Sequence, residues 1–191
     1  MTGEPGHPDP KALRALAHPL RWKLIDVLGS ENGATATRCA ELLGESVASC
    51  SYHLGMLAKY GYIEEVPDRP GREKPWRLTR PDQQLTPPGL DLDGELAAEA
   101  ALDVFLDHEL DRTKSRVRSG SLEPAPWRPG LQGMTAWLTE AEFVAVKQQL
   151  IGVLEQFAPR ARDASLRPES GREVRLFVAA SAARPTPAGE P

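Results

Sequence analysis

Cysteine and histidine are scarce in this chain of 191 residues, which holds two cysteines and four histidines. Cys39 and Cys50 form no Cys-x-x-Cys pair, and isolated cysteines of this kind suit a reducing cytoplasm. The histidines are dispersed along the chain, at His7, His18, His53 and His108. The spacing typical of a zinc site is therefore missing, and we expect neither a bound metal nor a cofactor.

The sequence also lacks long apolar runs and the common motifs of catalysis. Its N-terminus has no signal-peptide pattern, and no apolar run approaches the length of a membrane span. A glycine-rich phosphate loop and a Gly-x-Ser-x-Gly elbow are both missing. These absences favour a cytoplasmic protein that is not an enzyme and has no membrane partner.

Positive charge is not in excess. The net charge is −4, with 11 basic and 10 acidic residues in 1–80 and 12 basic and 17 acidic residues in 81–191. This balance argues against a protein that coats DNA generally. Any binding to DNA must therefore depend on local basic patches.

Two short helices joined by a tight turn are predicted between residues 35 and 61. In the first, Thr35 is a candidate N-cap, and one helical face carries small and apolar residues. Gly44 can adopt the left-handed conformation that ends this helix. The residues on the face are Ala36, Cys39, Ala40 and Leu43.

Ser46 is the candidate cap of the second helix, and Gly61 closes it. Its core-facing stripe is Cys50, Leu54 and Leu57. Small and hydroxylic residues on the outward face suit insertion into a DNA major groove. An alternative is a packing helix in a winged helix that does not bind DNA. The residues expected to point outward are Ala48, Ser49, Ser51, Tyr52 and Met56.

A basic hairpin is predicted next, because strand-like residues 62–66 and 76–79 flank a turn-rich connection over 67–75. Cationic hairpins contact phosphates, which supply affinity without reading sequence. The alternative is an ordinary solvated loop. The cations are Arg69, Arg72, Lys74 and Arg77.

Upstream, residues 11–28 predict two helices broken at Pro19. The motif Ala17-His-Pro-Leu-Arg, the helix pair with Ser51-Tyr-His-Leu, and Gly61-Tyr-Ile together resemble the ArsR-type winged-helix repressors over about residues 10–80. The resemblance implies a homodimer that binds an inverted-repeat operator in double-stranded DNA and is released or engaged by a signal. It also implies that the second helix reads the DNA, with Ser49, Ser51, Tyr52 and His53 at its contact positions.

Together these patterns predict a homodimeric repressor with helix 46–60 in the major groove and the wing 67–77 on phosphates. The predicted DNA-binding residues are Ser46, Ala48, Ser49, Ser51, Tyr52, His53, Lys59, Arg69, Arg72 and Lys74. Metal-sensing members of the family carry a Cys-x-Cys at positions that here look like Thr35 and Thr37, which are poor ligands for soft metals. We therefore expect a small organic effector, or none.

A long helix is predicted over 94–118, with Asp103, Asp107 and Asp111 at a four-residue spacing beside His108 and Glu109. One interpretation is a metal-responsive site, and the other is a solvated acidic face that complements the helix dipole. An apolar stripe on the same helix needs cover, for which a partner helix of a second subunit is the candidate. The stripe consists of Leu102, Phe105, Leu106, Leu110 and Val117.

The remaining sequence predicts a small β-α-β unit, with strands at 134–138 and 173–179 and a helix opened by a capping box at Thr139. It resembles the C-terminal extension of some actinobacterial ArsR-like regulators. Trp127 and Trp137 are interpreted either as the lining of an effector pocket or as core. The predicted fold class is α+β. The predicted organisation is a winged helix-turn-helix domain (1–80), a linker and dimerisation helix (81–133), the small unit (134–183) and a disordered tail (184–191).

Overall fold

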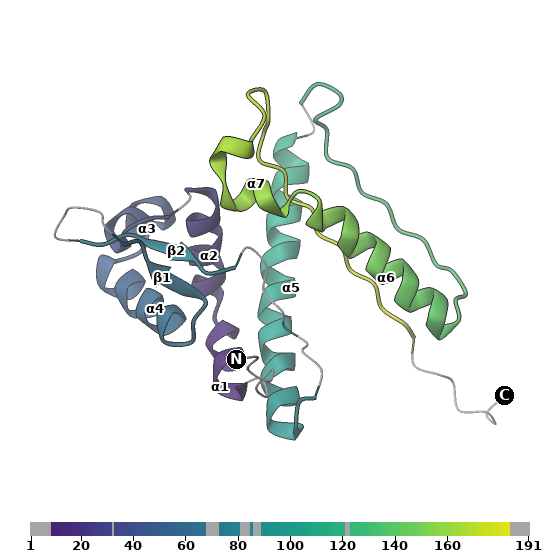
Figure 1. Ribbon diagram of the computed structural model, residues 1–191, viewed down its shortest axis with the longest axis horizontal. Coiled ribbons are helices and arrows are strands. Elements are labelled where there is room, and N and C mark those ends of the chain that lie inside the picture. The colour runs from purple at the N-terminus through teal and green to yellow at the C-terminus, as the bar shows by residue number, and fades with distance from the viewer. Residues whose placement is uncertain are drawn as a thin grey trace, which may run out of the picture. The chain divides into compact units, whose positions relative to one another are not determined.

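The computed structural model describes residues 9–31, 33–67, 73–80, 85, 89–120 and 123–183 (Figure 1). The chain divides into two units, Met1–Leu131 (unit 1) and Gln132–Pro191 (unit 2). The fold is mixed α+β and mainly helical, with one two-stranded antiparallel sheet among the described residues. None of the described helices is long and apolar enough to cross a membrane.

Unit 1 contains the predicted helices and the predicted hairpin strands. Its elements are α1 (Pro10–Leu16), α2 (Pro19–Ser30), α3 (Ala36–Leu43), α4 (Val47–Lys59), β1 (Ile63–Glu65), β2 (Trp76–Leu78) and α5 (Leu92–Gly120). The break at Pro19 is confirmed, since Pro19 is the first residue of α2. The turn between α3 and α4 is also as predicted: the Thr35 side chain accepts from the Arg38 N–H, and Gly44 has a φ of 67°.

The sheet pairs Ile63 with Leu78 and Glu65 with Trp76. A bridge that the sequence did not reveal joins it to the start of α3, because Ala34 and Trp76 exchange two backbone hydrogen bonds of 3.0 and 2.8 Å. Gly33 makes this approach feasible. Its φ is 112°, and a Cβ at this position would lie 3.1 Å from the Trp76 carbonyl oxygen. The hairpin strands are thus held against the helix pair.

The core of unit 1 forms where α2, α3 and α4 meet, and α5 packs against it through Ala101 and Phe105. The Phe105 ring lies 4.8 Å from the Trp22 ring. Leu102 also contacts this core, so the expectation that a partner helix covers the whole α5 stripe is wrong for Leu102 and Phe105. Their positions are covered by helices of the same chain, whereas Leu110 remains exposed.

The acidic side of α5 is only partly solvated. Asp103, Asp107 and Asp111 are exposed, but Glu109 is buried. Asp26 of α2 accepts from Arg112 and lies 2.8 Å from Nε2 of His108. His108 and Arg112 therefore hold α5 against α2 through Asp26. The interpretation as a solvated acidic face is wrong for Glu109, which is buried.

Unit 2 contains α6 (Glu140–Glu155), α7 (Ala158–Arg162) and a 3-10 turn, η1 (Ala164–Leu166). The capping box at Thr139 is confirmed, with reciprocal hydrogen bonds to Glu142. The β-α-β prediction is wrong: segments 134–138 and 173–179 are extended but belong to no sheet within the described chain. Alternating apolar residues create a strand only where a second strand accepts its hydrogen bonds. The predicted tail 184–191 lies outside the described residues.

Candidate nucleic-acid interface

The outward face of α4 is short, small and hydroxylic. Its cap is built as predicted, because the Ser46 hydroxyl accepts from the Ser49 N–H at 3.1 Å. Ala48 and Ser51 are exposed, and Tyr52 is 62% exposed. The opposite face holds the predicted stripe Cys50, Leu54 and Leu57, which is fully buried. Ala48, Ser51 and Tyr52 therefore form a narrow ridge without charged residues on the outward face of α4. The buried residues of the opposite face hold the helix in the core.

His53 does not belong to this ridge. The resemblance to the ArsR-type repressors implied a DNA contact for His53, but its side chain is only 8% exposed. Its Nδ1 accepts from the Arg21 Nε at 3.2 Å, and its ring lies 4.2 Å from the ring of His18. The expectation of a DNA-facing His53 is therefore wrong. This residue faces α2, one position beyond the exposed Tyr52, because a helix turns by about 100° per residue.

His18, His53 and Arg21 form a cluster behind the ridge. His18 is the N-cap of α2, where its Nδ1 accepts from the Leu20 N–H at 3.2 Å. Both imidazoles thus use Nδ1 as an acceptor and are neutral in this arrangement. Burial lowers the pKa of both histidines, and the positive charge of Arg21 lowers each pKa further; for His53 the neighbouring His18 also lowers it, while Glu45 acts in the opposite direction.

This cluster predicts a loss of stability in mild acid. Since the pKa of both histidines is lower in the folded chain than in the unfolded chain, the unfolded chain binds more protons as the pH falls below about 6.5. The free energy of unfolding should therefore decrease between about pH 7 and pH 5. In the double variant His18→Asn, His53→Asn, which keeps an acceptor but cannot titrate, this dependence should flatten. Urea unfolding at each pH measures this dependence. If the free energy of unfolding changes with pH as much in the double variant as in the wild type, the two histidines are not its cause.

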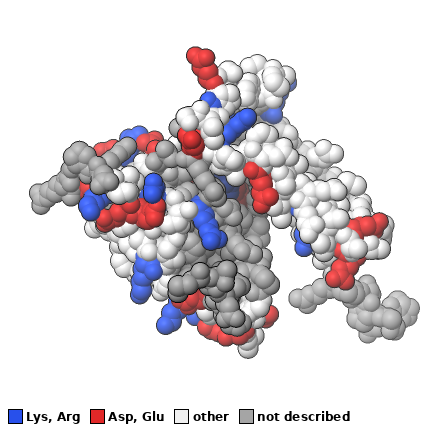
Figure 2. Space-filling view, in the orientation of Figure 1, with Lys and Arg blue, Asp and Glu red and all other residues white. Residues whose placement is uncertain are grey.

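The hairpin carries its cations beside acids. Lys74 lies 3.2 Å from Glu65, and Arg77 lies 2.7 Å from Glu64. Figure 2 shows the same mixture over the face in view, where Lys and Arg side chains alternate with Asp and Glu. Glu73 instead accepts from the Thr37 N–H at 3.0 Å, which ties the described end of the hairpin to α3. Arg69 and Arg72 lie outside the described residues.

The remaining predicted contact, Lys59, is exposed at the last turn of α4, with its ammonium 5.4 Å from the centre of the Tyr60 ring.

Thr35 and Thr37, which correspond to the Cys-x-Cys of metal-sensing family members, have other roles in this structure. Thr35 caps α3, and the backbone N–H of Thr37 donates to Glu73. Burial raises the pKa of the Cys39 thiol to about 11, which disfavours the thiolate that metals require. Within the described residues no group of three potential ligands converges.

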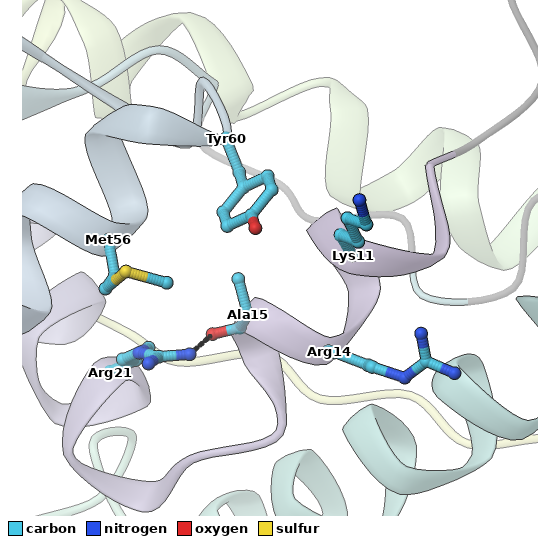
Figure 3. A pocket seen from close by; sticks show the side chains of 6 residues that line it. All are labelled: Lys11, Arg14, Ala15, Arg21, Met56 and Tyr60. Atoms are coloured by element: carbon cyan, nitrogen blue, oxygen red, sulfur yellow. Dashed lines mark hydrogen bonds between the residues drawn. The ribbon is translucent and has the colours of Figure 1, made fainter.

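Described residues of unit 1 line two cavities of interest here. The first, of about 260 Å³, lies between α1 and α4, where Met56 and Tyr60 extend toward Ala15 and Arg14 points away toward α5 (Figure 3). The second, of about 530 Å³, lies between α2 and α5 and includes Lys23 and Asp107. Trp127 and Trp137, which the sequence analysis interpreted either as the lining of an effector pocket or as core, line neither cavity. Both are exposed, Trp137 by 99%.

Comparison with known proteins finds no family model that matches this chain and no curated protein of significant similarity.

Proposed function

We propose that this protein is a sequence-specific DNA-binding transcriptional regulator that uses unit 1 as a winged helix-turn-helix. In this proposal α4 enters the major groove, and β1, β2 and their connection form a wing that contacts phosphates. The observation that carries the proposal is the ridge of Ala48, Ser51 and Tyr52 on a capped helix whose opposite face is fully buried. Such a helix can enter the major groove of DNA without any change in the core behind it.

A two-fold homodimer completes the proposal, since operators with inverted repeats require two reading helices. On α5 the residues Leu92, Leu96 and Leu110 are exposed although large and apolar. They fall on one side of the helix by their spacing. We propose that two copies associate through this side of α5. The stripe predicted from the sequence is less suitable, because Leu102 and Phe105 already pack against the core of the same chain.

A second candidate function is a winged-helix module that binds a protein and not DNA. It is favoured by the ion pairs of Lys74 and Arg77, which reduce the positive potential of the hairpin. Selection from a random pool of DNA duplexes distinguishes the two. A regulator should enrich an inverted repeat and bind it with an affinity that falls steeply with salt. A pool without enrichment, and no salt-dependent shift, would support the protein-binding module.

The ion pair of Lys74 provides a matched test of the wing. Lys74→Gln should weaken binding to every duplex and lower the salt slope by about one, because one phosphate contact is lost. Glu65→Gln should have the opposite effect, since it removes the carboxylate that competes with phosphate for Lys74. Exposed ion pairs are worth about 0–1 kcal/mol, so we expect affinity changes of up to about fivefold. Titrations over a salt series measure both; changes of the same sign would contradict the contact.

A further inference from the structure

The cavity between α1 and α4 contains a buried positive charge without a carboxylate beside it. Arg21 is 8% exposed, and both of its acceptors are neutral: its Nη1 donates to the Ala15 carbonyl at 2.6 Å, and its Nε donates to Nδ1 of His53 at 3.2 Å. No carboxylate of the described residues pairs with Arg21, and its Nη2 donates to neither acceptor. Burial lowers the pKa of Arg21, because a charge taken from water without an opposite charge is unfavourable. An anion in the cavity would supply the missing partner.

The other polar groups along this cavity also favour an anion. Lys11 lies one helical turn before Ala15 on α1 and is exposed, and Tyr60 directs its hydroxyl toward Ala15 (Figure 3). Arg14 lines the cavity too, but Asp93 of α5 accepts from both of its Nη atoms, so its charge is already balanced. Among the described residues that line the cavity, none is acidic. The unbalanced charges are therefore those of Arg21 and Lys11.

The cavity also has an apolar wall, formed by Met56, Ala15 and the ring of Tyr60. Its volume is about 260 Å³, just below the roughly 300–1,000 Å³ of typical ligand sites, so it suits a small compound. The Nη2 of Arg21 offers two N–H donors, and charge-assisted hydrogen bonds from arginine to a carboxylate are among the strong ones. A compound with one carboxylate and a short apolar body would use both parts of the cavity.

We propose that this cavity binds a small organic carboxylate, with the carboxylate at Arg21 and Lys11 and the apolar body against Met56 and Tyr60. The site is built from α1, α2 and α4 alone, so the proposal does not rest on DNA binding. Because its residues come from three helices that are packed together only in the folded chain, the ligand should bind folded unit 1 and stabilise it.

Titration of the full chain with benzoate, followed by the NMR signals of the methionine methyl groups, tests the site without DNA. The Met56 methyl signal should shift and saturate with a dissociation constant on the order of 1 mM, as expected for so small a ligand. The signal of Met134, which is exposed in unit 2, should not shift and so controls for nonspecific contacts. Benzamide has the shape of benzoate without its charge and should leave Met56 unchanged at the same concentrations.

Three variants assign the charge. Arg21→Gln keeps an N–H donor but no charge and should abolish the saturable shift, while its methyl spectrum without ligand reports whether unit 1 stays folded. Lys11→Gln, at an exposed position that does not threaten folding, should weaken benzoate binding about two- to fivefold. Lys23→Gln is the matched control, since it removes the same charge from an exposed position of α2 that does not line this cavity. It should bind benzoate as the wild type does.

Four results would overturn the proposal. The first is the absence of a saturable Met56 shift up to about 10 mM benzoate, and the second is an equal shift of Met134. The third is equal binding of benzamide, or an equal loss of affinity in Lys11→Gln and Lys23→Gln. The fourth concerns inorganic phosphate as a second probe: saturation by phosphate but not by benzoate would identify a site for inorganic anions and not for carboxylates.

Discussion

Replacement of Arg21 by alanine is expected to lower the free energy of unfolding of unit 1 by about 2–4 kcal/mol. Arg21 is 8% exposed, and its partners are neutral: its Nη1 donates to the Ala15 carbonyl at 2.6 Å and its Nε to the Nδ1 of His53. The arginine thereby joins α1 and α4 to the first turn of α2. Without it, a buried carbonyl and a buried imidazole nitrogen lose their donors, and each such loss costs about 1–3 kcal/mol.

Two further variants separate hydrogen bonding from packing at this position. Arg21→Met restores much of the apolar volume but no donor, so it should be nearly as unstable as Arg21→Ala. Arg21→Lys keeps one charged donor and should lose about half as much, because an ammonium cannot reproduce the two directions of the guanidinium fork. Urea unfolding of all three measures the order. Wild-type stability of Arg21→Met would show that the two acceptors do not need a donor.

Replacement of Tyr52 by alanine is expected to weaken binding to a selected duplex by about 5–150-fold, which corresponds to the 1–3 kcal/mol of a specific base contact. Binding to unrelated duplexes should change little. The reason is that Tyr52 is the largest exposed side chain on the α4 ridge, and its ring is held edge-on against His53 at 5.1 Å. This contact reduces the number of positions that the ring can adopt before it meets DNA.

Tyr52→Phe is the matched control, since it keeps the ring and removes only the hydroxyl. If Tyr52→Phe still prefers the selected duplex over unrelated duplexes, the aromatic ring makes the contact. If this preference is lost, the contact is a hydrogen bond of the hydroxyl. Both variants should unfold at nearly the wild-type temperature, because the side chain is solvated. An equal loss on selected and unrelated duplexes in Tyr52→Ala would contradict a role in reading sequence.

Local chemistry made much of the helical structure predictable. Thr35, Ser46 and Thr139 were identified as caps from residue type and position alone, since each needs only a backbone N–H two or three residues away. Gly44 was assigned to a left-handed turn for an equally local reason. The burial of Cys39, Cys50 and Leu54 followed from helical periodicity, because a short amphipathic helix has only one face that can enter a core.

Features that depend on a distant partner were not predictable in this way. The inward position of His53 depends on where α2 crosses α4, and the burial of Glu109 depends on how α5 packs. The bridge from Ala34 to Trp76 joins residues that no local pattern relates. In segments 134–138 and 173–179 the alternation was recognised, but a strand also requires a second strand in register, and the sheet of the described residues contains neither segment. The sequence by itself determined the helices, their caps and their buried faces, because those depend on neighbours within one or two turns. The tertiary structure decided which polar groups are buried and which apolar surfaces remain uncovered, because both depend on how elements far apart in the chain meet.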